Sequence, residues 1–511
     1  MTSAPARGGT EQDYSPDPRR WRALSVTLAA GFMTLLDVSI VSVALPSIQQ
    51  GLDTDPAGVQ WVVSGYALTF GLALVPAGRL GDAYGRRRMF LIALTAFVVF
   101  SALCGAAPTI ELLVIARLLQ GLAAGALAPQ NSGLIQSLFR GAERGRAFGF
   151  FGATVGISTA AGPIVGGLLL AAFGEPDGWR WIFYVNVPIG VLAVVLAARL
   201  LPKGRPGDRA DIDWVGAGLL GGAVLALLLP LVQAESGGVG RLWWLFPVGA
   251  ALAAAFIWWE RREVRREAEP LFDIRLVTET SGYAPGALLG LVYFTGFAGV
   301  WIVFAQFFQA GLGYTPLQSG LSVTAFAVGS AGSSVVAGRL VERVGRRLTV
   351  FGLSLVAVGI AGTAAILFVA PGDLAGFLAA PALLVGGIGG GFVISPNITM
   401  TLRNVPVRMA GSGGGALQTG QRVGAAIGTA TVAGVFYGVL GGSGGSYRAA
   451  IAGALGVSVL TTLIALGVGV WDRRNEKLRT AGVGAPDPDA PDTRGVGVSA
   501  DDDTPHHVSH D

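Results

Sequence analysis

Charged side chains are scarce in this chain of 511 residues. Asp, Glu, Lys and Arg make up 13% of the sequence, whereas they form about 25% of a typical soluble domain. Hydrophobic residues account for 52%. A surface that faces water on all sides cannot be built from this composition, so the sequence predicts an integral membrane protein.

Cysteine and histidine are also rare, which excludes several kinds of chemistry. Cys104 is the one cysteine, so no internal disulfide can form. The three histidines, His506, His507 and His510, lie in a polar tail, where solvation explains them better than a metal site. The phosphate-binding pattern Gly-x4-Gly-Lys-Ser/Thr is missing as well. We therefore expect no enzyme activity, no ATP drive, no metal and no cofactor.

Long apolar runs, by contrast, are abundant. Fourteen of them approach or exceed the length of about 20 residues that a helix needs to cross a bilayer. Because fourteen is even, both ends of the chain should lie on the same side. The predicted spans lie near 23–45, 58–80, 89–107, 110–135, 147–172, 181–200, 214–233, 242–260, 283–309, 317–340, 348–369, 374–399, 411–439 and 449–471.

Basic residues are distributed unevenly between the two sides. Of the 36 Lys and Arg residues, 31 fall in the two tails and in every second connection. Lys and Arg concentrate in cytoplasmic loops of membrane proteins, so both termini are predicted to be cytoplasmic. Since the basic residues flank apolar segments, the net charge of +4 does not indicate a nucleic-acid partner.

A short pattern occurs once in each half of the chain. The segment Gly-Arg-Leu-Gly-Asp-Ala-Tyr-Gly-Arg-Arg-Arg of 78–88 is repeated as Gly-Arg-Leu-Val-Glu-Arg-Val-Gly-Arg-Arg of 338–347. Each copy follows the second span of its half, which predicts two similar six-helix bundles. The expected division is a cytoplasmic amino tail (1–21), an amino-terminal bundle (22–204), two extra bridging helices (205–270), a carboxyl-terminal bundle (271–475) and a disordered cytoplasmic tail (476–511).

The repeated pattern suits a gate between the bundles. Glycine permits tight turns, and a carboxylate can cap the amino end of a neighbouring helix. A simple anchor of positive charge would explain the arginines but not the repeated glycine and acid spacing. The predicted gate residues are Gly78, Asp82, Gly85 and Arg86 in the first copy and Gly338, Glu342 and Gly345 in the second.

Further motifs lie in register with the predicted spans. They are Leu-Asp-Val-Ser-Ile-Val-Ser-Val-Ala-Leu-Pro at 36–46, Arg-Leu-Leu-Gln-Gly at 117–121, Trp-Arg-Trp-Ile-Phe-Tyr-Val-Asn-Val-Pro-Ile-Gly at 179–190, and the cluster Gly152, Gly156, Gly162, Pro163, Gly166 and Gly167. With the repeat, they resemble the major facilitator superfamily, and within it the fourteen-helix drug:proton antiporter branch. The resemblance covers about 22–474. It implies an all-α membrane fold of two six-helix bundles plus two bridging helices.

Two charges within the predicted spans are candidates for proton coupling. Asp37 and Arg117 each lie about 12 to 14 Å below the outer surface, at about 1.5 Å per residue. If the first and fourth helices are neighbours, as the resemblance implies, the two side chains can pair. A coupling site that binds and releases a proton is one interpretation. A permanent structural ion pair, or Asp37 capping its own helix, is the other.

The glycine and proline cluster of the fifth span has two possible roles. Glycine allows close helix packing, and proline removes a backbone donor and permits bending. The resemblance assigns this cluster to exporters, where it could seal one access pathway. Helix packing alone would explain the same residues.

Residues for substrate contact are expected where aromatic and amide side chains gather within the spans. Such surfaces accept large amphipathic molecules, although aromatics that face lipid have the same sequence signature. Arg422 could hold a substrate oxygen, pair with Asp37, or bond to helix backbone. The predicted cavity residues are Gln60, Trp61, Tyr66, Gln120, Trp301, Phe304, Gln306, Phe308, Gln421 and Arg422.

Together these features predict a proton-driven antiporter that exports amphipathic drugs or antibiotics by alternating access. Its expected partners are the lipid bilayer, a small amphipathic substrate and protons, and it is expected to be monomeric. The Ala, Gly and Arg bias suggests a bacterial inner membrane. An exporter or flippase of lipids or cell-envelope precursors is the alternative, because it would use the same bundles.

Overall fold

The computed structural model describes residues 17–482 apart from 175, 204–212, 235–236, 267 and 269. All regular secondary structure in these ranges is helical. The tail predicted to be disordered lies outside the described residues from 483 onward, together with its three histidines. Thirteen of the described helices are long and apolar enough to cross a membrane.

The first half of the chain folds into six spans, of which the sixth is formed by two helices. Their bounds are α1 (Arg20–Gly51), α2 (Pro56–Tyr84), α3 (Arg86–Ala106), α4 (Ile110–Leu138), α5 (Gly141–Phe173), α6 (Arg180–Tyr184) and α7 (Asn186–Leu200). The predicted sixth span, 181–200, is interrupted at Val185. Pro188 explains the interruption, because proline lacks the amide hydrogen that would bond to the carbonyl of Tyr184.

The second half is built in the same way. Its helices are α12 (Tyr283–Phe297), α13 (Val300–Gln306), the short π-helix η2 (Phe307–Gly311), α14 (Pro316–Val344), α15 (Arg346–Val369), η3 (Gly372–Leu374), α16 (Ala375–Thr401), η4 (Val407–Met409), α17 (Ala410–Gly442) and α18 (Tyr447–Gly482). The predicted span 283–309 is divided by a turn at Ala298 and Gly299.

The second helices of the two halves, α2 and α14, begin and end alike. The side chains of Asp55 and Thr315 each accept a hydrogen bond from the first turn, and a proline follows each of them. Both helices stop at a glycine in the positive-φ region, Gly85 at 96° and Gly345 at 61°. The internal repeat read from the sequence is therefore also a structural repeat.

Four of the described elements lie between the two halves. They are α8 (Trp214–Val232), α9 (Gly238–Arg241), α10 (Leu245–Arg265) and α11 (Arg275–Thr278). The predicted span 242–260 corresponds to α10, which is not among the thirteen helices that are apolar enough to cross a membrane. The reason is its carboxyl end, where five of the six residues from Glu260 to Arg265 are charged.

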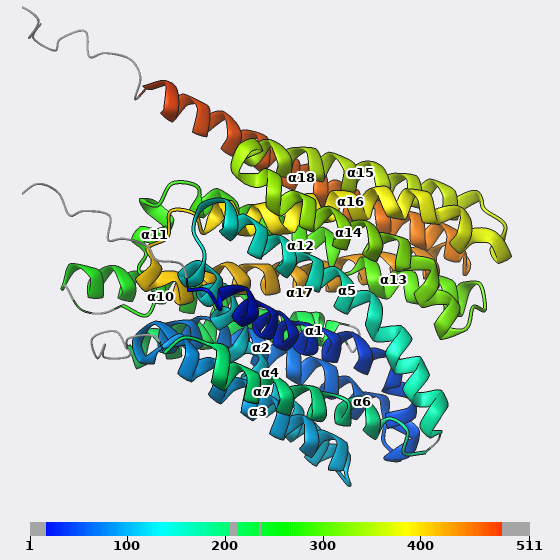
Figure 1. The fold of residues 1–511 in the computed structure, drawn as a ribbon. Helices are drawn as coiled ribbons and strands as arrows, with labels where there is room; N and C mark the ends of the chain where they lie inside the picture. Colours follow the sequence, from blue (N-terminus) through cyan, green and yellow to red (C-terminus); the bar gives the residue numbers. More distant parts are fainter. Residues whose placement is uncertain are drawn as a thin grey trace, which may run out of the picture.

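The two halves form separate bundles that lie side by side (Figure 1). The blue and cyan helices of the first half occupy one side of the molecule, and the yellow and red helices of the second half occupy the other. The helix α1 begins and α18 ends at the same end of the molecule, which we call the terminal end. The arginine-rich turns after α2 and α14 lie at this end as well.

The bundles meet most extensively where α2 packs on α17 and α5 packs on α14, and α4 with α17 and α5 with α16 add further contacts. Glycine lines the two larger crossings: a side chain at Gly78 would overlap the backbone of Gly411, and one at Gly149 would press on Gly338. Close backbone approach of this kind requires small residues. The bridging helix α8 packs against both α2 and α17, with Leu228 in a small apolar cluster on α2.

Candidate functional site

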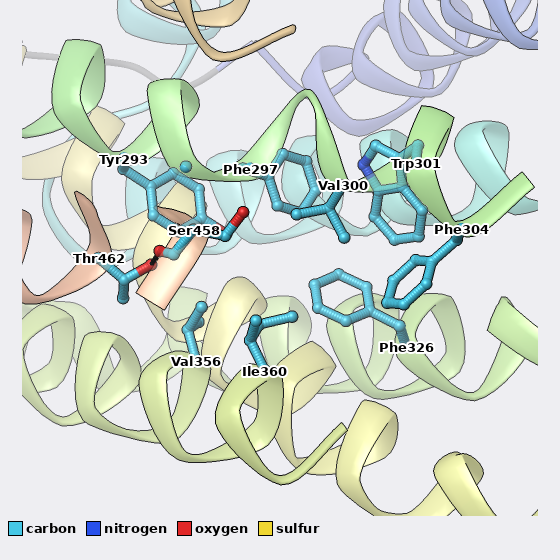
Figure 2. Close-up of a pocket in the computed structure, with 11 residues that line it drawn as sticks. Tyr293, Phe297, Val300, Trp301, Phe304, Phe326, Val356, Ile360, Ser458 and Thr462 are labelled. Carbon is cyan, nitrogen blue, oxygen red and sulfur yellow. Dashed lines mark hydrogen bonds between the residues drawn. The ribbon is translucent and has the colours of Figure 1, made fainter. Parts of the chain in front are cut away.

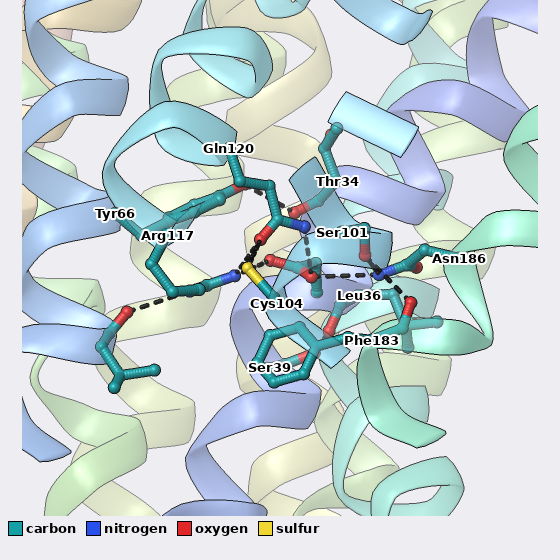
Figure 3. A network of polar contacts seen from close by, with 12 residues as sticks. Thr34, Leu36, Ser39, Tyr66, Ser101, Cys104, Arg117, Gln120, Phe183 and Asn186 are labelled. Carbon is teal, nitrogen blue, oxygen red and sulfur yellow. Dashed lines mark hydrogen bonds and ion pairs between the residues drawn. The ribbon is translucent and has the colours of Figure 1, made fainter. Parts of the chain in front are cut away.

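Asp37 is buried in the first bundle, where it accepts hydrogen bonds from a polar network that includes Arg117, Gln120 and Asn186. Figure 3 labels these three donors. Asp37 Oδ2 accepts a hydrogen bond from Arg117 Nη1 at 2.6 Å, and Oδ1 accepts one from Gln120 Nε2 at 3.1 Å. Arg117 also donates to the side-chain oxygen of Gln120 and, through Nε, to the carbonyl of Val62. Asp37 is 0% exposed and Arg117 is 1% exposed, so the pair is shielded from solvent.

Aromatic rings complete the surroundings of the pair. The Arg117 guanidinium lies 4.2 Å from the ring centroid of Tyr66 and 5.6 Å from that of Phe183. The Tyr66 hydroxyl donates to the carbonyl of Thr34, one turn before Asp37. A guanidinium that bonds to a carboxylate and stacks on aromatic rings is well compensated for burial.

The same carboxylate has a third donor that the sequence reading missed. Asn186, the first residue of α7, donates from Nδ2 to Asp37 Oδ1 at 3.0 Å and to Ser101 Oγ at 3.1 Å. Cys104 joins the network through Gln120. The sequence did contain a clue, because Asn186 belongs to the motif at 179–190. A neutral amide within an apolar span, however, is a weaker indication of a functional site than a charged side chain is.

The first copy of the repeated pattern connects the two bundles. Asp82 accepts hydrogen bonds from the backbone amides of Gly411 at 3.0 Å and Ser412 at 2.9 Å, at the start of α17. Arg86 forms an ion pair with Asp82 at 2.8 Å and also donates to the carbonyl of Val407. We call this group, with these five residues, the inter-bundle clamp. A carboxylate at a helix amino end is favoured by the free amides and the helix dipole.

The second copy makes different contacts. Glu342, which takes the place of Asp82, is exposed and interacts electrostatically with Arg144 of α5. Arg346, which takes the place of Arg86, is buried and pairs with Asp472 of α18 at 2.7 Å within its own bundle. It also donates to Asn397 of α16 at 2.7 Å. Gly338 does reach the other bundle, where it lies against α5.

The glycine cluster of α5 faces two different neighbours. Side chains added at Gly152 and Gly156 would press on Ser334 and Ala331 of α14. Further along α5, the positions on the other side contact α1 instead: Gly162 lies against Ser39, and Gly166 against Ile40. Pro163 lies near Gly320 of α14, whereas Gly167 faces open space. The cluster therefore packs α5 between the second bundle and the helix that carries Asp37.

The residues predicted to line one substrate cavity lie in separate places. Trp301 and Phe304 line a small apolar pocket inside the second bundle, together with Tyr293, Phe297 and Phe326 (Figure 2). Phe308 is fully buried beside Tyr314, at the end of the same helical stretch. Trp61 packs on the apolar cluster between α2 and α8. Tyr66 and Gln120 belong to the Asp37 network.

Arg422 lies between the bundles. Its guanidinium stands 4.2 Å from the ring centroid of Phe70, which belongs to α2 of the first bundle. Gln421, its neighbour in α17, lies beside Gly290 of α12 and is half-buried, as are Gln60 and Gln306. Arg422 thus reaches the first bundle through an aromatic ring rather than through Asp37.

The sequence of this chain matches a known protein family and several characterised relatives. The family model described as Major Facilitator Superfamily matches residues 27–259 and 286–497. The chain is 36% identical over 443 residues to the probable actinorhodin transporter of Streptomyces coelicolor, covering 86% of this chain and 76% of the relative. It is 36% identical over 471 residues to the puromycin resistance protein pur8 of Streptomyces alboniger, covering 88% and 91%.

Solved structures agree on the fold. The human organic anion transporter MFSD10 matches 89% of this chain and 100% of its own with a TM-score of 0.62 at 14% identity. The proton:xylose symporter XylE matches 87% and 94% with a TM-score of 0.61 at 15% identity. These identities support the fold alone. The family match over most of the chain and the two relatives of 36% identity show that the chain belongs to the Major Facilitator Superfamily, as a multi-pass membrane transport protein and not an enzyme.

Proposed function

We propose that this protein exports amphipathic drugs or antibiotics across the bacterial inner membrane in exchange for protons. The observation that carries the proposal is the buried ion pair in the first bundle, in which Arg117 Nη1 lies 2.6 Å from Asp37 Oδ2. Ionisable residues inside a membrane are costly and usually functional. The relatives named for actinorhodin transport, puromycin resistance and tetracenomycin C resistance and export support this class of substrate.

Proton exchange follows from two opposing influences on the Asp37 carboxyl group. The nearby guanidinium and the amide donors favour the carboxylate, while burial favours the neutral acid. A movement of α1 relative to α4 that lengthens the contact with Arg117 would therefore favour proton uptake. Restoring the contact would release the proton. The energy source in this proposal is the proton gradient, with no cofactor.

Alternating access requires a barrier that opens and closes. In the proposed orientation the terminal end faces the cytoplasm, and the inter-bundle clamp closes that side. Its hydrogen bonds join Asp82 of the first bundle to Gly411 and Ser412 of the second. Rocking of the bundles would break these bonds and admit substrate from the cytoplasm or inner leaflet. A single chain holds all these parts, so the working unit is proposed to be a monomer.

Inverted membrane vesicles offer the direct test. The vesicles are energised to an acid interior, and the pH gradient is followed while lipophilic cations or antibiotics are added. We expect each transported compound to dissipate the gradient with the unaltered protein and to have little effect with Asp37→Asn. Asp373→Asn serves as the control, because Asp373 is an exposed carboxylate outside the network.

Two outcomes would contradict the proposal. If the inserted, folded protein responds to no amphipathic compound, drug export is wrong and export of lipids or cell-envelope precursors takes its place. If Asp37→Asn exchanges protons as well as the unaltered protein does, Asp37 is not the coupling site.

A further inference from the structure

The motif at 179–190 docks the sixth span onto its neighbours. Trp179 is fully buried against Gly51 at the end of α1. Arg180 donates to the carbonyls of Gly105 at 3.0 Å and Ala107 at 2.6 Å, which are otherwise free at the carboxyl end of α3. Gly190 packs directly on Val98 of α3. These contacts fix the sixth span against α1 and α3 at both ends of the motif.

Asn186 lies between these fixed points, at the interruption caused by Pro188. Its amide group uses both hydrogens, one toward Asp37 Oδ1 at 3.0 Å and one toward Ser101 Oγ at 3.1 Å. Ser101 in turn donates to the carbonyl of Phe183 at 2.9 Å. The hydrogen bonds from Ser101 to Phe183 and from Asn186 to Ser101 therefore hold the amide with one N–H toward the carboxylate (Figure 3).

We propose that Asn186, oriented by Ser101, is a positioning residue that sets the pH at which Asp37 takes up and releases its proton. The proposal rests on the proton-coupled function given above. It extends that function by giving the motif at 179–190 a physical role, namely to deliver a neutral hydrogen-bond donor to the coupling carboxylate.

The chemistry of the amide explains the direction of the effect. An N–H group stabilises the charged carboxylate by a charge-assisted hydrogen bond. A protonated Asp37 would instead need an acceptor, and the buried Oδ1 of Asn186 has no hydrogen-bond partner in the described structure. To offer that oxygen, the amide would have to turn over and give up its bond to Ser101. Ser101 thus holds Asn186 in the orientation that favours ionised Asp37.

Other groups around Asp37 also influence its protonation, and their contribution must be separated from that of Asn186. The titratable groups that face the carboxylate are Arg117 from α4, Tyr66 from α2 and Cys104 from α3. From α5, the carbonyl of Ser158 accepts a hydrogen bond from the Ser39 hydroxyl of α1. Asn186 differs from these groups because it is neutral and makes no bond to Arg117. A substitution of Asn186 therefore leaves the charges of Asp37 and Arg117 unchanged.

The test is an infrared titration of the purified protein. The Asp37 signal is the carboxyl C=O band that disappears in Asp37→Asn, and its intensity is followed against pH. In Asn186→Ala we expect the midpoint to move about one pH unit upward, since a hydrogen bond to a charged group is lost. In Ser101→Ala the midpoint should move the same way by a smaller amount, because the amide can then turn over.

Thr363→Val is the matched control. Thr363 is equally buried and hydrogen-bonded, but within α15 of the other bundle. A midpoint that is unchanged in both Asn186→Ala and Ser101→Ala would overturn the proposal. If Asn186→Ala does not fold, Ser101→Ala decides alone. The titration needs no substrate, so its result stands apart from the vesicle experiment: absence of drug-driven exchange would refute the proposed function without moving these midpoints.

Discussion

The two copies of the glycine and arginine pattern share six of their ten aligned residues, at 78–87 and 338–347, but bind different partners. In the first copy, Asp82 and Arg86 contact the start of α17 in the opposite bundle. In the second copy, Arg346 turns inward and pairs with Asp472 of its own bundle. In the proposed transport cycle, the contacts of the first copy would break and re-form as the bundles move, whereas the ion pair of the second copy would stay within one bundle.

The comparison separates the part of the pattern that sets the backbone from the part that makes hydrogen bonds between the bundles. Both copies keep the turn glycine and the glycine at the helix crossing, so the backbone geometry is shared. They differ in the acid, which is buried at Asp82 and exposed at Glu342. A repeated motif thus predicts repeated backbone structure, but among the described residues only the acid of the first copy accepts backbone hydrogen bonds from the opposite bundle.

The largest effect is expected from Asp82→Asn. The change removes a buried charge that accepts two backbone hydrogen bonds and pairs with Arg86, and charged hydrogen bonds contribute about 1.5–3 kcal/mol each. Substrate-driven proton exchange should fall about tenfold or more. Glu342→Gln, measured in the same vesicles, should keep at least about half of the activity because its exposed carboxylate contributes little. Equal losses in both variants would show that the two copies gate alike.

Asp472→Asn is expected to lower the stability of the folded protein rather than its substrate-driven proton exchange. The substitution leaves the buried Arg346 guanidinium, about 2% exposed, without its carboxylate. Breaking such a pair costs about 3–5 kcal/mol, so the melting temperature in detergent should fall by about 5 °C. Asp177→Asn, which breaks the exposed pair with Arg180, should change it by less than about 1 °C. An unchanged melting temperature for Asp472→Asn would mean that the ion pair of Arg346 and Asp472 does not stabilise the second bundle.

The smallest effects should be equal in the two copies. Gly85→Ala and Gly345→Ala force alanine into positive-φ turns, and the added methyl group meets little else. Such strain costs about 1–3 kcal/mol, which should lower the melting temperature by about 1 to 3 °C in each case. Gly332→Ala in α14 is the control, because its surroundings are open and helical. A large inequality between the two turns would contradict the shared backbone geometry.

Part of the site could be predicted from the sequence. Asp37 and Arg117 stand out because charges within apolar spans are rare, and counting residues from the span ends gave them a common depth. The crossing glycines and Asp82 followed from the repeat. These predictions needed only helix geometry and the order of the spans.

The remainder depends on how helices are rotated about their axes. Asn186 carries no charge, and its contact with Asp37 is fixed by the docking of α6 and α7 on α3. Arg346 could not be matched to Asp472, because Asp472 lies just beyond the predicted last span, 449–471, and a span boundary does not show which helix its side chain faces. The substrate residues were predicted from side-chain type, which does not indicate the direction a side chain takes. Trp301 lines a pocket inside the second bundle, whereas Trp61 packs on the cluster between α2 and α8.

The bridging helix α8 has a consequence for compounds dissolved in the lipid. It packs on both α2 and α17, and Leu228 and Val224 fill the groove where those two helices meet. A molecule that diffuses sideways through the membrane toward this flank meets a covered joint. The joint between α5 and α14 is contacted on both helices by α16, which belongs to the second bundle itself. In the proposed transport cycle, lateral entry from the bilayer at the joint of α2 and α17 would thus require α8 to move.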